Sequence, residues 1–306
     1  MKEIRFATWN IRLSGTNGRF TRQKLDKLRA LRESGFELIA LQQVFKHGFG
    51  ALQELRGSGA FPHLFPETFP EVAKADRACA ILAAGRFDAV DQPRNIKSLP
   101  FPERSCIVSL RSEGEVVTVA SFHFVPGRSQ RRNRGPIQKR KNFRLVASWL
   151  ATQDRRTIVG LDCNSPRVDH PLLSSNQYFR NRRGRMSIDQ EEYLLHDPSR
   201  APPGLRHCLV DAYRRYLDAH PSKLREAVKH FEKVHKEQRQ GCLATSHIAG
   251  HRERRFAYIY ITPDLRPVCV DYRPVAEVQE AGSRHGIVVA ELRPGKEPPL
   301  FQNSGP

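Results

Sequence analysis

Several features that would place a chain at a membrane or outside the cell are absent from this sequence. It has no run of about 18 or more apolar residues, which argues against a membrane-spanning helix. Its charged first residues lead directly into a strand-like segment, so neither a signal peptide nor a transit peptide is expected. None of the six cysteines forms a CxxC pair. We therefore expect reduced, mostly buried thiols rather than a disulfide framework or a zinc site, and a cytoplasmic protein.

Acidic residues are also scarce relative to basic ones. The 306 residues include 51 Lys and Arg against 32 Asp and Glu, a net charge of +19. The basic residues cluster at 126–144, 180–185 and 251–255. Clustering of this kind indicates a polyanionic partner, with nucleic acid first and an anionic membrane surface second. An arginine-rich proteome with simply solvated charged faces is the alternative that composition leaves open.

Hydrophobic patterning predicts one two-layered α/β domain over residues 1–295, with residues 296–306 as a flexible tail. Apolar runs rich in strand formers predict strands at 3–9, 37–44, 78–82, 105–110, 115–125, 157–164, 255–262, 269–275 and 285–292. Helical spacing or an amphipathic charge pattern predicts helices at 22–34, 47–56, 143–153 and 222–240. The stretch 167–250 is otherwise the least regular part of the chain.

Four segments, in order, resemble the signature strands of the endonuclease/exonuclease/phosphatase superfamily: TWNIR (8–12), LIALQQV (38–44), VGLDCN (159–164) and SRHGIVV (283–289). Two further segments, ASFHF (120–124) and RFAYIYIT (255–262), resemble other strands of the family in the expected places. The resemblance implies a DNase I-like fold, a four-layered α/β sandwich of two packed mixed β-sheets flanked by helices. It also implies phosphodiester or phosphomonoester hydrolysis with a divalent cation, Mg²⁺ or Mn²⁺.

The resemblance assigns roles to five residues of this chain. Asn10 matches an asparagine that holds the cation, and Asp162 and Asn164 match the Asp-x-Asn pair that positions and activates the nucleophile. His285 matches the histidine that contacts the scissile phosphate, and His123 matches a histidine common in the central strand. These positions are the catalytic and metal candidates that the resemblance implies.

Three acids that the family pattern requires are missing. Gln43 stands where a glutamate would hold the metal, Ala257 where an aspartate would orient His285, and Arg284 where an aspartate would precede that histidine. Gln43 still offers a carbonyl oxygen as a weak ligand, but it brings no charge. Losing a carboxylate beside a divalent ion costs several kcal/mol even at an effective dielectric constant of about 20. We therefore expect weak or absent Mg²⁺ binding.

Arginine in place of an acid changes what such a pocket prefers to bind. Arg284, together with Arg128, Arg131 and Arg132 of the first basic segment, is predicted to bind phosphate, because guanidinium groups grip phosphate bidentately. A solvent-facing Arg284 beside a merely decayed pocket is the alternative.

The aromatic side chains that lie among the basic residues are candidates for stacking on bases. They are Phe143, Tyr178 and Phe179.

Two hypotheses on function remain open at this point. The first is a nuclease-like phosphodiesterase that engages DNA or RNA with weakened or altered metal-dependent hydrolysis. The second is a catalytically inactive protein that binds nucleic acid or phosphate on the same scaffold. Hydrolysis of a lipid head group or small phosphate ester is a third, for which no lipid-seeking stretch occurs. The sequence leaves open the oligomeric state and whether Asp76, Asp169 or Asp211 replaces the missing acids.

Overall fold

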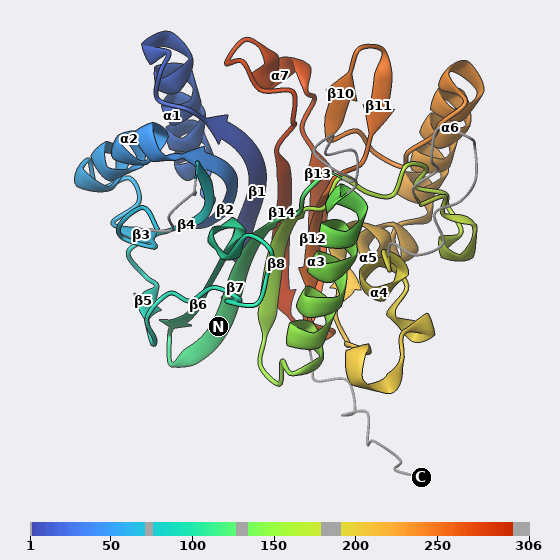
Figure 1. The fold of residues 1–306 in the computed structure, drawn as a ribbon, viewed down its shortest axis with the longest axis horizontal. Helices are drawn as coiled ribbons and strands as arrows, with labels where there is room; N and C mark the ends of the chain where they lie inside the picture. The colour runs from blue at the N-terminus through green and yellow to red at the C-terminus, as the bar shows by residue number, and fades with distance from the viewer. Residues whose placement is uncertain (1, 71–75, 127–133, 179–190, 296–306) are drawn as a thin grey trace.

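The computed structural model describes residues 2–70, 76–126, 134–178 and 191–295. Two six-stranded β-sheets pack face to face, and helices cover their outer faces (Figure 1). No helix of the described residues is long and apolar enough to cross a membrane. The layered arrangement confirms the predicted α/β sandwich.

In the first sheet the strand order is β13 (Leu265–Tyr272), β14 (Val288–Pro294), β1 (Ile4–Leu13), β2 (Leu38–Phe45), β4 (Arg77–Ala83), β3 (His63–Phe65). In the second sheet it is β5 (Asp88–Ala89), β6 (Ser105–Ser112), β7 (Glu115–His123), β8 (Thr157–Asp162), β12 (Ala257–Ile261), β9 (Val210–Asp211). A separate hairpin consists of β10 (His247–Ala249) and β11 (Arg252–Arg254). Both sheets are mixed, because β1 with β2 and β7 with β8 are parallel pairs while the other pairs are antiparallel.

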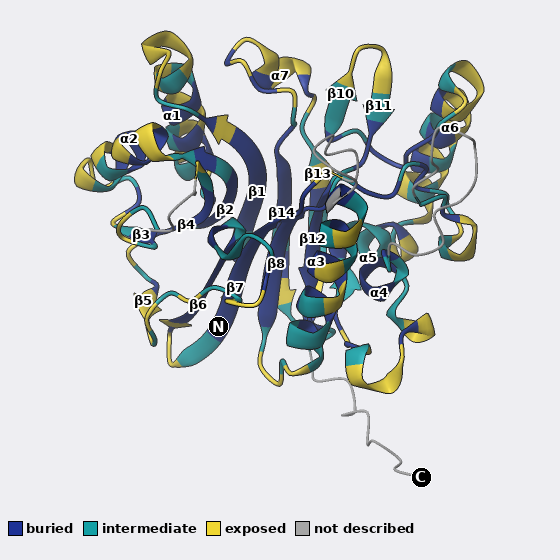
Figure 2. Ribbon diagram, in the orientation of Figure 1, coloured by how far each residue is buried: buried dark blue, intermediate teal, exposed yellow. Residues whose placement is uncertain are grey.

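The helices are α1 (Gly18–Glu33), α2 (Lys46–Gly57), α3 (Arg134–Ala151), α4 (Tyr193–His196), α5 (Ala212–Ala219), α6 (Pro221–Gln238) and α7 (Ala276–Gln279). The apolar faces of α1 and α2 pack on the outer face of the first sheet, and those of α3 and α4 pack on the outer face of the second. A third apolar cluster fills the space between the sheets. The central strands are therefore buried on both faces, as Figure 2 shows, which explains their almost continuous apolar sequences.

The structure differs from the sequence prediction in a few boundaries. The helix expected at 143–153 begins at Arg134, so the described end of the first basic segment is helical. The strand expected from residue 285 begins at Val288, because the residues before it pair with the β10–β11 hairpin instead. Neither α5 nor this hairpin was predicted within 167–250, since both are too short to produce a clear periodic pattern.

The two sheets are in close contact at Gly160 of β8. A Cβ atom on Gly160 would lie 2.6 Å from the Ala40 Cβ and 2.6 Å from the Thr8 Oγ1. Gln42 bridges the sheets at this level, because its Nε2 donates to the Thr8 Oγ1 and the Ser121 Oγ, both at 3.0 Å. Small side chains and one bridging amide therefore set the distance between the sheets here.

This close approach brings the next inward-facing residues together, because strand residues two apart lie on the same face. Asn10 follows Thr8 by two positions, and Asp162 follows Gly160 by two. The site described below lies one layer beyond the contact at Gly160.

Gly160→Ala is expected to lower the free energy of unfolding by about 1–3 kcal/mol, since the added methyl group must push the sheets apart. Urea denaturation measures the change. Gly57→Ala is the matched control, because a Cβ there meets nothing within 4 Å. Equal stability of the two variants would show that the sheets are not held this closely.

Candidate nuclease-like site

Four of the predicted site residues, Asn10, His123, Asp162 and His285, lie together at one edge of the sandwich. This edge is where β7 and β8 end, next to the β10–β11 hairpin (Figure 1). Asp162, the last residue of β8, pairs in register with His123 of β7 on one side and with Ala257 of β12 on the other. Asp162 is fully buried. The sheet register thus places the one remaining acid of the family pattern at the centre of the site.

Asp162 contacts three of the elements that sequence analysis singled out. The Asn10 Nδ2 donates to the Asp162 Oδ2 at 2.5 Å, and the Asn164 backbone N–H donates to the Oδ1 at 3.2 Å. The His285 Nδ1 lies 3.4 Å from the Oδ2, which is longer than a good hydrogen bond. The single carboxylate therefore lies between the cation-binding asparagine and the phosphate-contacting histidine of the family pattern.

Burial governs the charge state of these groups. It raises the pKa of Asp162 above its usual value, while the hydrogen bond from Asn10 acts in the opposite direction. Burial lowers the pKa of His285 to about 4, and the Arg12 guanidinium acts in the same direction. The pKa of His123 is held well below its usual value by burial and by the charge of Arg104. Both imidazoles are therefore neutral at pH 7.

His247 belongs to the site although no sequence pattern pointed to it. Its ring stacks on that of His285, with centroids 4.3 Å apart, and its Nδ1 lies 3.1 Å from the Arg284 carbonyl oxygen. Burial lowers the pKa of His247 to about 4, with the neighbouring His285 acting in the same direction. A tertiary contact between the hairpin and the residues before β14 creates this pair, so the local sequence carries no signal of it.

The remaining predicted positions have other surroundings. Asn164 adopts a left-handed φ of 53° and donates from its Nδ2 to the Phe124 carbonyl oxygen at 3.2 Å, away from Asp162. Gln43 has a φ of 60° at an irregularity in the pairing of β2. Ala257 is buried in the apolar cluster between the sheets, and Arg284 is exposed.

Asp76, Asp169 and Asp211 do not replace the missing acids. Asp76 forms a two-point pair with Arg77, at 2.8 and 2.6 Å. Asp169 and Asp211 both bind the fully buried Arg255, at 3.1 and 2.6 Å. Each of these carboxylates already forms an ion pair with an arginine and is therefore not free to bind a metal ion.

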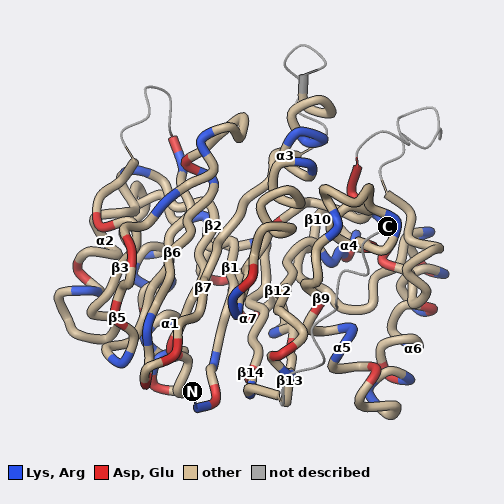
Figure 3. The backbone as a smooth tube through the Cα atoms, turned by 90° about the horizontal axis from the view of Figure 1, so that it is seen from below, with Lys and Arg blue, Asp and Glu red and all other residues tan. Residues whose placement is uncertain are grey.

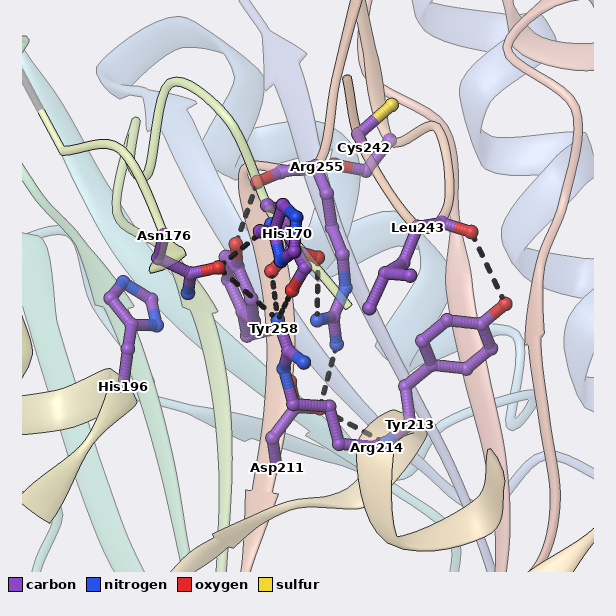
Figure 4. Close-up of polar contacts among 12 residues, drawn as sticks. His170, Asn176, His196, Asp211, Tyr213, Arg214, Cys242, Leu243, Arg255 and Tyr258 are labelled. Carbon is purple, nitrogen blue, oxygen red and sulfur yellow. Dashed lines mark hydrogen bonds and ion pairs between the residues drawn. The ribbon is translucent and has the colours of Figure 1, made fainter. Parts of the chain in front are cut away.

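Figure 4 shows part of the buried network around Arg255, in which Arg214 is a second cation bound to Asp169. The Arg255 guanidinium also lies over the rings of Tyr213, Tyr258 and Tyr272. This network ties the segment after β8 and the start of α5 to the beginning of β12. Its role is structural, because each charge in it is matched within the protein.

The oxygen ligands around Asp162 do not form a magnesium site like the one that the family resemblance implies. Mg²⁺ prefers oxygen ligands, and protein sites usually supply one or two carboxylates. The Asn10 Oδ1 is buried without a hydrogen-bond partner among the described residues, so one neutral oxygen is available. No group of three His, Cys, Asp or Glu ligands converges on Asp162 in the described part of the chain. One carboxylate and one amide oxygen are a poor ligand set for this ion.

A cavity of about 230 Å³ lies beside Asn164. Its cationic lining residues are Lys139, Arg167, Arg252 and Arg254, and the imidazole of His247, with its low pKa, also lines it. The one acid in the lining, Glu192, is buried and pairs with Lys139 at 3.0 Å. Basic residues also lie along α3 and next to β10 in the view of Figure 3. The cavity is therefore cationic.

The structure shows where part of the three predicted basic segments lies. Of the third basic segment, Arg252 and Arg254 line the cavity, whereas Arg255 is directed into the buried network. Arg128, Arg131 and Arg132 lie outside the described residues, as do Phe179 and the whole second basic segment, 180–185.

The proposed stacking role is wrong for Phe143. Its ring is fully buried and packs edge-on against Phe124, so it cannot reach a base. Tyr178 is half-buried, with its ring stacked on His196.

Several solved structures have a similar fold. An endonuclease/exonuclease/phosphatase protein from Beutenbergia cavernae is 17% identical with a TM-score of 0.59, over 96% of this chain and 72% of that one. The human Nocturnin catalytic domain with bound sulfate is 15% identical with a TM-score of 0.58, over 95% and 94%. D. rerio TDP2 complexed with a single-strand DNA product is 12% identical with a TM-score of 0.59, over 95% and 99%.

No protein-family model and no curated protein matches the sequence. The structural similarity and the two packed mixed sheets nevertheless define the fold. The chain has a DNase I-like fold, a sandwich of two packed mixed β-sheets flanked by helices, which it shares with these structures.

Asp162→Asn is expected to raise the melting temperature at pH 8, by about 2–4 °C for each kcal/mol gained. A folded-state pKa above the unfolded value means that the charged form of Asp162 destabilises the fold at high pH. This cost disappears as the pH falls to the pKa of Asp162 in the unfolded chain, because the side chain is then protonated in both states. The melting temperatures of the variant and the wild type should therefore become equal near pH 4. Thermal unfolding from pH 4 to 8 measures the difference.

Asp26→Asn is the control, because its carboxylate is 59% exposed and should show no such trend. An Asp162→Asn variant that is less stable than the wild type at pH 8 would contradict the interpretation of Asp162 as an uncompensated buried charge.

Proposed function

We propose that this chain binds nucleic acid through its phosphates, at the cationic cavity beside Asn164. On this proposal the metal-dependent hydrolysis typical of the superfamily is lost or strongly reduced. The main support for this proposal is that the site keeps a single carboxylate, while lysine and arginine side chains line the adjoining cavity.

The cavity suits a phosphate group better than a whole small molecule. Its volume of about 230 Å³ is below the roughly 300–1,000 Å³ of pockets for drug-sized ligands. Arg252 is exposed at the cavity, where it can meet a chain of phosphates from solvent. The sulfate bound to Nocturnin and the DNA product bound to TDP2 support an anionic ligand on this fold.

Weak hydrolysis follows from the electrostatics of the site. In-line attack on a phosphodiester builds negative charge, which a cation and fixed donors must stabilise. Asn10 and Asp162 alone are a poor site for a divalent cation, and Gln43 and Ala257 add no charge. The cationic side chains can hold the phosphate, but they do not supply a metal-activated water.

A second function, hydrolysis without a tightly held metal, is favoured by the contact between Asp162 and His285. The two groups lie 3.4 Å apart, and the low pKa of His285, about 4, keeps its imidazole neutral at pH 7 but makes it a weak base. Asp162 would orient this base, and a water bound at the site would lose its proton to it during attack. We rank this second, because the site lacks the charge stabilisation that a metal provides.

Arg252→Gln is expected to weaken binding to a short DNA duplex by roughly three- to tenfold and to reduce the slope of log affinity against log salt by about 0.9. The reason is that one phosphate contact, with its released counterions, is lost. Fluorescence anisotropy over a series of salt concentrations measures both quantities.

Arg111→Gln is the matched control, because Arg111 is exposed on β6 and pairs with Val116, at the end of β7 opposite His123. If both variants bind like the wild type, or if the wild-type affinity is insensitive to salt, the cavity is not the binding site for nucleic acid.

Supercoiled plasmid is expected to be retarded by the protein but not nicked, with Mg²⁺, with Mn²⁺ or with EDTA, as resolved on agarose gels. No nicking is expected because the site lacks the carboxylates that would hold a catalytic metal ion. Asp162→Ala and His285→Ala are the accompanying variants.

Cation-dependent nicking that Asp162→Ala abolishes would contradict the proposal and would reveal a rebuilt metal site. Nicking that persists in EDTA but is lost in both variants would instead establish the second function.

A further inference from the structure

A cluster of potential metal ligands lies on the far side of the β10–β11 hairpin from the cavity residues. His230 of α6, Cys242 of the following loop and Glu253 of β11 each direct one ligand atom to a common point. These three atoms lie within 4.8 Å of one another. In the described residues no other group of three His, Cys, Asp or Glu side chains converges in this way.

The distances match the needs of a small tetrahedral ion. Nitrogen and oxygen ligands about 2.0–2.1 Å from Zn²⁺ lie about 3.3–3.4 Å apart in a tetrahedron. The His230 Nε2 and the Glu253 Oε2 are 3.4 Å apart. The Cys242 Sγ lies within 4.8 Å of the other two ligand atoms, and reaching the roughly 3.6 Å spacing of a tetrahedral site needs an inward movement of up to about 1.2 Å. Thiolate, imidazole and carboxylate donors together suit Zn²⁺ far better than Mg²⁺ or Ca²⁺.

Further contacts hold the ligands in place before any ion binds. The Thr245 hydroxyl donates to the Glu253 Oε2 and lies 3.3 Å from the His230 Nε2. The Gln238 Oε1 accepts the Glu253 backbone N–H at 3.0 Å. The bond to Gln238 orients the strand that carries Glu253. The Thr245 hydroxyl contacts the ligand atoms themselves, so an ion that binds there would displace it from the His230 Nε2.

Close packing fixes the loop that carries Cys242. A Cβ on the preceding Gly241 would lie 2.5 Å from a ring carbon of Phe231, so only glycine allows the loop to approach α6 this closely. Cys242 is buried, whereas the side chains of His230 and Glu253 are 37% and 29% exposed. An ion can therefore reach the thiol from solvent past the other two ligands.

The geometry points to a zinc site made by His230, Cys242 and Glu253, with one position left for water, which fastens the β10–β11 hairpin to α6. The hairpin in turn pairs with the residues before β14: the Ile248 N–H donates to the Arg284 carbonyl oxygen at 3.2 Å. Binding of the ion would thus stabilise the hairpin that carries His247 over His285. This inference does not depend on the proposed nucleic-acid binding.

Zinc binding is tested on the full chain, freed of any histidine tag and dialysed against EDTA. Titration with Zn²⁺ against a chromophoric chelator is expected to show one ion per chain. Co²⁺ is expected to give the absorption bands of a tetrahedral site with a thiolate ligand. Zinc should also raise the melting temperature and slow hydrogen exchange in residues 247–254.

Cys242→Ser and Glu253→Gln are expected to weaken zinc binding on the order of 100-fold and to remove the thiolate band in the case of the serine variant. Glu253→Gln keeps the inference testable if the buried serine impairs folding, which circular dichroism in EDTA reveals. Cys208→Ser is the matched control, because Cys208 is an exposed thiol outside the cluster, and it should bind zinc like the wild type.

No binding by the wild type, or equal loss in the Cys208→Ser control, would overturn the inference. The cluster would then be a hydrogen-bond network centred on Thr245.

Discussion

The distance between the two sheets at Gly160 is the constraint on which the site depends. Glycine in β8, with Ala40 and Thr8 opposite, lets the backbones approach until the amide of Gln42 spans them. One layer further, the same distance puts the Asn10 amide in contact with the Asp162 carboxylate. A bulkier residue at this level would separate these two groups before it affected any loop, because packed interiors transmit small changes in volume.

The site at Asp162 combines one buried carboxylate with an adjoining cavity that several arginines line. Asp162 remains buried between His123 and Ala257, where burial opposes its ionisation. Nearby acids are satisfied by arginines elsewhere, so they are not free to restore a cation site. The adjoining cavity is lined by arginines instead, and this is the basis of the proposed phosphate binding.

The β10–β11 hairpin links the two candidate sites. On one side it carries His247 and two cavity arginines, and on the other it carries Glu253 of the proposed zinc cluster. Such a short hairpin is not stable alone, so its position depends on what it packs against. The backbone bonds to the residues before β14 and the contacts with α6 hold it from two directions.

The sequence by itself determined the layered α/β fold, because buried strands and amphipathic helices have periodic patterns that survive without tertiary information. It also indicated which strand ends carry Asn10, His123, Asp162 and His285, through the order of the family-like segments. It showed which acids are missing, since an absence of charge is visible in the letters alone. The tail and the arginines at 128–132 stay predictions.

Tertiary structure alone decided what surrounds those residues. In the folded chain Phe143 is buried, and Asp169 and Asp211 form ion pairs with Arg255. The ring of His247 stacks on that of His285. The tertiary structure also brought His230 and Glu253 to Cys242, although the cysteine spacing gave no sign of a zinc site. These arrangements depend on how the hairpin, α6 and the segment after β8 pack together, and packing between separate segments leaves no periodic signal in any one of them.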